Sequence, residues 1–310
     1  MKRMITFLLL AAALLLGACS AQTESTPAQG VRFTDALERE VTVHSARRVA
    51  VLIGSFADVW CLAGGRETMV ATANDAWTEF DLDLPEEVVN IGSVKEPNLE
   101  LILAAEPDFI IASANTGADV ALLETFEQLE IPVAYFRVST FEEYLNMLDI
   151  CTRITGETER YATYGETIRE RVDAALARAD GSAPTALYLR ASASGVKVKN
   201  SVNSVLGEML KDLGAVNIAD SDKTLLETLS MESIIAADPD FIFVVLQGSD
   251  EDAVRQVFEE RMVSDPAWSG LSAVRRDAVY VMDSRLFNLK PNARWGEAYE
   301  ILADILYPDA

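Results

Sequence analysis

A stretch of fourteen residues occurs twice in this 310-residue chain, and this duplication constrains the fold more than any other feature. The first copy, "NLELILAAEPDFII", occupies residues 98–111, and the second, "SMESIIAADPDFIF", occupies residues 230–243. Eight of the fourteen positions are identical. Because proline disfavours helix at the residue before it, each copy predicts a short helix, a Pro-Asp corner and a buried strand beginning with Phe-Ile. The chain is therefore expected to contain two related structural units.

Short apolar runs alternate with helical stretches on both sides of the middle of the chain. Strands are predicted at residues 48–53, 68–73, 88–92, 108–113, 132–138, 185–190, 195–199, 240–245 and 278–283. Helices are predicted at residues 55–64, 98–105, 118–129, 203–213, 230–237, 251–261 and 292–307. Strands that alternate with helices form mostly parallel sheets with both faces covered. The predicted fold class is α/β, with two lobes that each contain a mostly parallel central sheet flanked by helices.

The segment between the two halves predicts a long helical connection. Thr140 followed by Glu143 fits a capping box, and Gly156 separates this helix from a second one over about 157–179. The second helix would be about 35 Å long at 1.5 Å per residue, so a single long α-helix joins the lobes as a stiff connector. The predicted domains are an N-terminal lobe over 31–139, connecting helices over 140–182 and a C-terminal lobe over 183–310.

The first thirty residues have the pattern of an export signal and a tether. Lys2 and Arg3 precede a largely apolar stretch of twelve residues, 5–16, which is too short for a stable membrane span. The following letters, Leu-Gly-Ala-Cys, resemble the bacterial lipobox, which implies that residues 1–18 are removed and that Cys19 is acylated. Residues 19–30 are small, polar and contain proline, as expected of a flexible tether. An ordinary signal peptide with a chance cysteine is the alternative.

Composition limits the kinds of partner and chemistry. The net charge is −23 and becomes −25 without residues 1–18, which argues against nucleic acid as a partner. Cys61 and Cys151 lie in apolar periodic stretches and are interpreted as two buried thiols rather than a disulfide. His44 is the single histidine. A zinc or manganese site usually draws on several His or Cys ligands, so no metal site and no cofactor are predicted.

The lipobox-like signal, the tether, the two lobes and the connecting helix together resemble the substrate-binding lipoproteins of ABC importers. The branch is the one that serves iron–siderophore complexes, haem and vitamin B12. The stretches "FTDALEREVTV", "RVAVLIGSFADVWCLAGG" and "NLELILAAEPDFII" carry the resemblance, which covers about residues 31–308. One departure is Glu38, which stands where a glycine is common in the family. The resemblance implies a monomer, lipid-anchored on the extracytoplasmic face of the cell membrane, that delivers a small metal chelate to a membrane permease dimer.

Two acidic residues occupy the same position in the two copies of the repeat. Glu100 in "NLELI" and Glu232 in "SMESI" match the family's acidic residues that dock each lobe onto arginines of the permease. A pair of carboxylates related by a pseudo-twofold axis suits a dimeric partner, and opposite charges speed encounter. The helix dipole also favours Glu in a first turn, but it does not explain why both copies carry Glu at this position.

The ligand site is expected where the carboxyl ends of both sets of strands face one groove, because ligands of open α/β sheets bind there. Several predicted strand ends in this acidic chain carry Arg or Lys, which favours an anionic ligand. Trp77 and Phe287 could stack on a flat ligand, whereas Trp60 is interpreted as a core residue. The candidate ligand-binding residues are Ser55, Trp77, Lys95, Asn115, Arg137, Arg190, Lys199, Asn200, Gln247, Arg285, Phe287, Lys290 and Arg294.

Arginine presents a fork of donors that suits carboxylate and catecholate-like oxygens, so an anionic ferric siderophore is the first expectation. A corrinoid, held mainly by apolar and aromatic contacts, is second. Haem is third, because His44 lies in the opening hairpin and the axial ligand would have to be Tyr, Met or none.

Two other classes of function remain as alternatives. One is a two-lobed enzyme, but the chain has no G-x-S-x-G, H-E-x-x-H, P-loop or G-x-G-x-x-G motif, and catalysis is not predicted. The other is a surface receptor that works without a permease.

Overall fold

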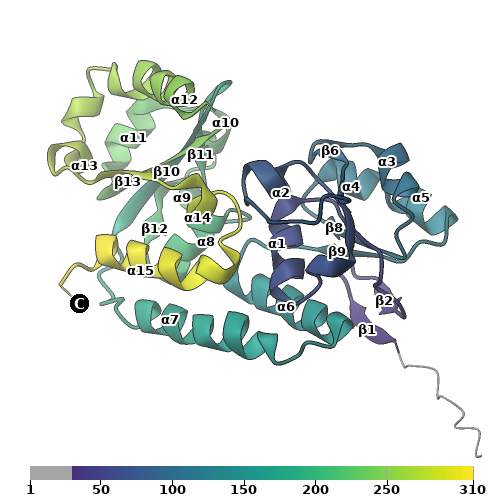
Figure 1. Cartoon of the computed structure of the whole chain (residues 1–310). Helices are drawn as coiled ribbons and strands as arrows, with labels where there is room; N and C mark the ends of the chain where they lie inside the picture. The colour runs from purple at the N-terminus through teal and green to yellow at the C-terminus, as the bar shows by residue number, and fades with distance from the viewer. Residues whose placement is uncertain (1–29, 249, 310) are drawn as a thin grey trace, which may run out of the picture.

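Two α/β lobes make up the computed structural model, which describes residues 30–248 and 250–309 (Figure 1). The predicted signal peptide, Cys19 and the tether up to residue 29 lie outside the described residues. The N-terminal lobe has a parallel sheet in the order β5-β4-β3-β8-β9. Its strands are β3 (Val49–Val51), β4 (Met69–Thr72), β5 (Val89–Asn90), β8 (Phe109–Ser113) and β9 (Val133–Phe136). Its helices are α1 (Gly54–Leu62), α2 (Asp75–Thr78), α3 (Leu99–Ala104), α4 (Gly117–Ala121) and α5 (Leu123–Gln128).

The C-terminal lobe repeats this design with one antiparallel strand. Its sheet has the order β11-β10-β13-β14, with β12 also paired to β10, and only β11 runs antiparallel. The strands are β10 (Thr185–Ser192), β11 (Gly195–Lys199), β12 (Val216–Asn217), β13 (Phe241–Gln247) and β14 (Val279–Met282). The helices are α8 (Val205–Asp212), α9 (Ile218–Ser221), α10 (Thr224–Glu227), α11 (Met231–Ala237), α12 (Glu251–Phe258), α13 (Ser272–Arg275), α14 (Ser284–Phe287) and α15 (Trp295–Leu306).

The duplicated stretch has the predicted structure in both lobes. Asn98 and Ser230 cap α3 and α11 by accepting backbone N–H groups. The residue before each proline leaves the helical conformation, with φ of 47° at Glu106 and 38° at Asp238. Each helix thus ends at a Pro-Asp corner, as predicted, and β8 and β13 begin directly after these corners.

The aspartate of each corner ties its strand to the neighbouring one. Asp108 accepts hydrogen bonds from Ser45 Oγ and from the backbone N–H of Arg48, just before β3. Asp240 accepts hydrogen bonds from the N–H and the Oγ1 of Thr185, the first residue of β10. In both lobes this carboxylate fixes the start of the strand that pairs with the Phe-Ile strand.

Alternate residues of the central strands face two different cores. Val51 and Ile111 of the N-terminal lobe belong to a core that also contains Tyr188 and Phe243 of the C-terminal lobe. The intervening residues face a separate core in each lobe. Both faces of each sheet are thus apolar, which explains why the strands form continuous hydrophobic runs in the sequence. The two lobes are joined by a shared core as well as by the connector.

The connector consists of two helices. The capping box predicted at Thr140 and Glu143 starts α6 (Phe141–Thr155), and Gly156 ends it with a φ of 83°. The predicted second helix, 157–179, forms as a helical run over residues 160–176, with a π-helical stretch at Ala162–Glu166 before α7 (Thr167–Leu176). Figure 1 shows α7 lying along α15, where Arg171 pairs with Glu300 at 2.7 Å.

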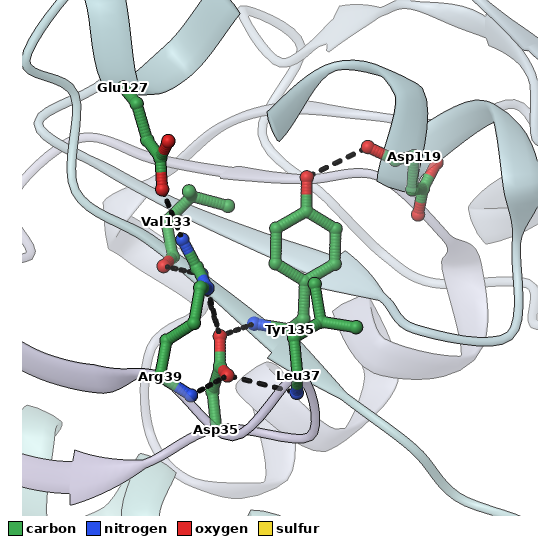
Figure 2. Close-up of polar contacts among 7 residues, drawn as sticks. All are labelled: Asp35, Leu37, Arg39, Asp119, Glu127, Val133 and Tyr135. Carbon is green, nitrogen blue, oxygen red and sulfur yellow. Dashed lines mark hydrogen bonds and ion pairs between the residues drawn. The ribbon is translucent and has the colours of Figure 1, made fainter. Parts of the chain in front are cut away.

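The predicted opening hairpin, β1 (Val31–Thr34) and β2 (Glu40–Val43), protects the edge of the N-terminal sheet. Asp35 at its tip accepts the N–H of Tyr135 in the edge strand β9, and Arg39 pairs with Asp35 at 2.6 Å (Figure 2). Arg39 also donates to the carbonyl of Val133. Covering an edge strand in this way removes a site of unwanted pairing. Glu38 adopts a φ of 61°, the left-handed region that favours glycine.

Short elements account for most differences from the sequence predictions. The predicted helix 118–129 forms as two helices, α4 and α5, which divide at Leu122. Four-residue helices such as α2, α9 and α14 were not predicted, because one turn of helix leaves no periodic pattern. Trp60 is fully buried, as expected. Cys61 and Cys151 are both free thiols, as expected; Cys151 is buried as predicted, whereas Cys61 is only partly buried.

Candidate functional site: a basic cavity between the lobes

A cavity of about 520 Å³ opens between the two lobes. Two of its lining residues follow β8 and β9 of the N-terminal lobe, and the others come from β10, the start of α8 and the loop after α14. They are Asn115, Arg137, Tyr188, Arg190, Asn203, Ser204, Val205, Asn288 and Lys290. The cavity thus lies at the carboxyl ends of both sheets, where open α/β folds bind their ligands.

Two arginines face the cavity from opposite lobes, and each is held by an asparagine. Arg137 donates from Nε to Oδ1 of Asn115 at 3.3 Å, and the amide nitrogen of Asn115 donates to Ser139 Oγ at 3.3 Å. Arg190 donates from Nη1 to Oδ1 of Asn288 at 3.1 Å. Neither arginine forms an ion pair with any residue that the structure describes.

Lys290 adds a third positive group to the cavity wall. Burial lowers the pKa of its ammonium to about 8, a change that Glu143 opposes and that Arg190 reinforces. The pKa of Lys199 at the end of β11 is also lowered by burial and by the charge of Arg190. Lys290 likewise has no ion pair within residues 30–248 and 250–309. An anion in the cavity would therefore meet positive groups that form no ion pair within the described residues.

A smaller cavity of about 210 Å³ lies next to the first and shares Lys290 with it. Arg285 covers the ring of Phe80 across the lobe boundary at 5.4 Å from the ring centroid. Arg294, which also lines this space, pairs with Glu297 at 2.7 Å. Burial raises the pKa of Asp58, although a hydrogen bond from Asn292 opposes the change.

The structure thus brings together part of the predicted ligand-binding set. Asn115, Arg137, Arg190 and Lys290 line the larger cavity, and Arg285 and Arg294 line the smaller one with Lys290. The remaining candidates lie outside both linings: Ser55, Trp77, Lys95, Lys199, Asn200, Gln247 and Phe287.

Two of these candidates are buried instead of facing a groove. Phe287 is 1% exposed and packs in the shared core, so it presents no face on which a flat ligand could stack. Ser55 is 2% exposed, and its carbonyl accepts a hydrogen bond from Asn292 across the lobe boundary. Trp77 packs at the margin of the shared core, whereas Lys95 and Gln247 are exposed at a hairpin and a strand end.

Five lining residues were not among the sequence candidates: Tyr188, Asn203, Ser204, Val205 and Asn288. Tyr188 was recognisable in principle, because it is two positions before Arg190 in β10 and side chains two apart share a face of a strand. The others belong to loops and a helix start, where the sequence has no periodic pattern.

The two predicted docking residues are exposed in the first turns of equivalent helices. Glu100 lies in α3 and Glu232 in α11. Figure 1 shows these helices on different lobes but both on the side of the molecule away from α7. Both Glu residues are thus exposed on helices of this side's two lobes.

Among the described residues, no group of three or more His, Cys, Asp or Glu side chains could hold a metal ion. Within residues 30–248 and 250–309, no helix combines the length and the apolar character needed to cross a membrane.

Two α/β lobes with a polar cavity at their strand ends define a two-lobed solute-binding protein. The periplasmic binding protein family model matches residues 49–286, which is most of the chain, and the chain belongs to this family.

Relatives of known name agree with this assignment over nearly the whole chain. The iron-uptake system-binding protein of Bacillus subtilis is 25% identical, covering 96% of this chain and 94% of the relative. The periplasmic haem-binding protein RhuT of Roseiflexus has a TM-score of 0.69 at 20% identity, covering 85% of this chain and 99% of RhuT. SirA of Staphylococcus aureus, solved with staphyloferrin B, has a TM-score of 0.66 at 22% identity, covering 89% and 97%. The two structural matches support the fold.

Proposed function

We propose that this protein is the substrate-binding component of an ABC importer and that it carries an anionic iron chelate, a ferric siderophore. The observation that carries the proposal is the set of three cations in the cavity, Arg137, Arg190 and Lys290, which form no ion pair among the described residues. This arrangement is unusual in a chain with a net charge of −23. Cations that face one cavity without forming ion pairs favour an anion over a neutral solute.

The lining also favours an oxygen-rich ligand. Apart from Tyr188 and Val205, every lining residue presents a charged group, an amide or a hydroxyl. Guanidinium groups pair well with carboxylate and catecholate-like oxygens. The names of two relatives, an iron-uptake system-binding protein and SirA with staphyloferrin B, support an iron chelate as the ligand class. The scarcity of apolar lining residues gives less support to a corrinoid.

The role is transport without catalysis, with the chelate delivered to a permease dimer. Glu100 and Glu232 dock the two lobes onto the permease, one lobe on each subunit. The protein acts as a monomer on the extracytoplasmic face, held at the membrane by a lipid on Cys19. These assignments rest on the sequence pattern and on the exposure of both Glu residues.

Direct titration tests the proposed ligand class. The probes are ferric citrate, ferric staphyloferrin B and a ferric tris-catecholate, all anionic, with an uncharged ferric trihydroxamate as the comparison. Arg137→Ala and Arg190→Ala should each weaken binding of the anionic probe by about 10- to 150-fold, equivalent to 1.5–3 kcal/mol per charge-assisted contact. Arg153→Ala on α6 removes the same charge from a surface ion pair with Asp149 and should leave affinity unchanged.

Wild-type protein that binds the uncharged trihydroxamate as tightly as the anionic probes, or that binds none of the anionic probes, contradicts the proposal.

One observation favours haem as a second candidate. Tyr188 lines the cavity and could serve as an axial ligand to haem iron. Against this, Tyr188 is 1% exposed and burial raises the pKa of its hydroxyl to about 12, so the phenolate form is costly. A Soret band that differs from that of free haemin, and that shifts again in Tyr188→Phe, would establish haem; a band identical to that of free haemin would exclude it.

A further inference from the structure

The two cavity arginines differ from most other arginines of the described chain in the kind of group that orients them. Most of the others pair with carboxylates, as Arg171 does with Glu300 and Arg169 with Glu142. In the cavity, the partners of Arg137 and Arg190 are the neutral amide oxygens of Asn115 and Asn288. The same arrangement occurs once in each lobe.

An amide oxygen and a carboxylate oxygen have different consequences for a bound anion. Both accept a hydrogen bond and so restrict the guanidinium to one direction. A carboxylate also cancels the positive charge and competes with the ligand for the remaining N–H donors, and this effect is strong where water is excluded. The amide orients the group but leaves its whole charge to the ligand.

Each asparagine is itself fixed by the fold. The amide nitrogen of Asn115 donates to Ser139 Oγ, which is 3% exposed. Asn288 is the residue that ends α14, and its N–H donates to the carbonyl of Ser284. The side chain of Asn115 and the backbone of Asn288 are therefore anchored by contacts other than the arginines.

We propose that Asn115 and Asn288 are positioning residues that give the cavity its selectivity for anions, by orienting Arg137 and Arg190 without neutralising them. The inference rests on the proposed function, because it assumes an anionic chelate in this cavity. It predicts that the charge of the orienting group, and not only its hydrogen bond, controls affinity.

Replacing the amide with a carboxylate of the same shape separates these two contributions. Asn288→Asp keeps an acceptor beside Arg190 and adds one negative charge, whereas Asn288→Ala removes the acceptor and adds none. We expect Asn288→Asp to weaken binding of the anionic ferric probe on the order of 10- to 100-fold. Asn288→Ala should weaken it by only about 3- to 10-fold, the effect of one neutral hydrogen bond. Asn115→Asp and Asn115→Ala should follow the same order.

Two further measurements test whether a charge outside the cavity or a loss of stability could explain weaker binding. Gln128→Glu on α5 adds the same charge at an exposed position outside the cavity lining and should bind the probe as the wild type does. The thermal unfolding midpoint of Asn288→Asp should equal or exceed that of the wild type, because the new ion pair with Arg190 is stabilising. If the probe binds more weakly while the unfolding midpoint does not fall, the loss of affinity comes from the added charge in the cavity and not from a loss of stability.

The outcomes separate failure of this inference from failure of the proposed function. If Asn288→Asp binds the anionic probe more tightly than Asn288→Ala while Arg190→Ala loses affinity, the asparagine is only a structural support and the inference is wrong. If Arg190→Ala and Arg137→Ala both bind the probe as the wild type does, the proposed site itself is wrong, and the inference fails with it.

Discussion

The pH dependence of ligand binding should reveal Lys290 directly. Its pKa of about 8 results from burial in the cavity wall, with Arg190 lowering it further and Glu143 opposing. An anionic chelate stabilises the protonated ammonium, so binding takes up a proton when the free lysine is partly neutral. Affinity is therefore highest below pH 8 and falls as the pH rises through the pKa of the free protein.

The size of the effect follows from one charge-assisted contact. If the bound anion stabilises the ammonium by about 2 kcal/mol, linkage weakens the affinity by roughly eightfold between pH 7 and pH 9. The best-bound anionic ferric probe would be titrated calorimetrically at pH 7, 8 and 9. Repeating the titration at pH 8 in buffers of different ionisation enthalpy counts the protons taken up.

Lys290→Arg is the matched control, because a guanidinium stays charged throughout this range. Any change of the probe itself with pH affects the titrations of Lys290→Arg and of the wild type equally. Its affinity should be nearly constant from pH 7 to pH 9, and Lys290→Gln should bind weakly and also without pH dependence. An equal loss of affinity with pH in the wild type and in Lys290→Arg would refute the role of Lys290.

Three further predictions concern docking and stability. Glu100→Ala combined with Glu232→Ala should reduce iron uptake by cells while leaving the affinity of the purified protein unchanged, and undiminished uptake would refute docking. Asp108→Ala and Asp240→Ala each remove the carboxylate that fixes the start of a strand. Each should lower the free energy of unfolding, measured by urea titration, by about 2 kcal/mol. An unchanged urea midpoint would contradict this role. The hydrogen bond from the N–H of Thr185 holds the pKa of Asp240 below its usual range, so this stabilisation should be present at neutral pH and lost as the pH falls through that pKa. Trp295→Ala leaves a cavity in the shared core, where Trp295 is fully buried, and should lower the free energy of unfolding by about 3–5 kcal/mol. Independent unfolding of the two lobes would contradict the shared core.

The fold was predictable because its main signals are local and repeated. The two Pro-Asp corners, the capping box at Thr140 and the stop at Gly156 are determined by residues next to one another in the sequence. The central strands were visible because the shared core and the separate cores make both faces of each sheet apolar. The one-turn helices were missed because tertiary contacts, not sequence periodicity, hold them.

The candidate site was predictable in part, for a geometric reason. Arg137 and Asn115 directly follow parallel strands, and the carboxyl ends of such strands meet at one edge of the sheet. Phe287 occupies an equally plausible position in the sequence, but it turns into the core. The direction of a loop side chain depends on the packing of both lobes, which no local pattern encodes. The pairing of each arginine with an asparagine depends on the same packing.

The most direct test of the central claim is to locate iron in the protein. Crystals grown with the best-bound anionic ferric probe would be measured at the iron absorption edge. The account predicts one anomalous peak per chain, in the cavity between Arg137 and Arg190 and within reach of Lys290. A peak outside this cavity, or a chelate bound without contact to either arginine, would contradict it.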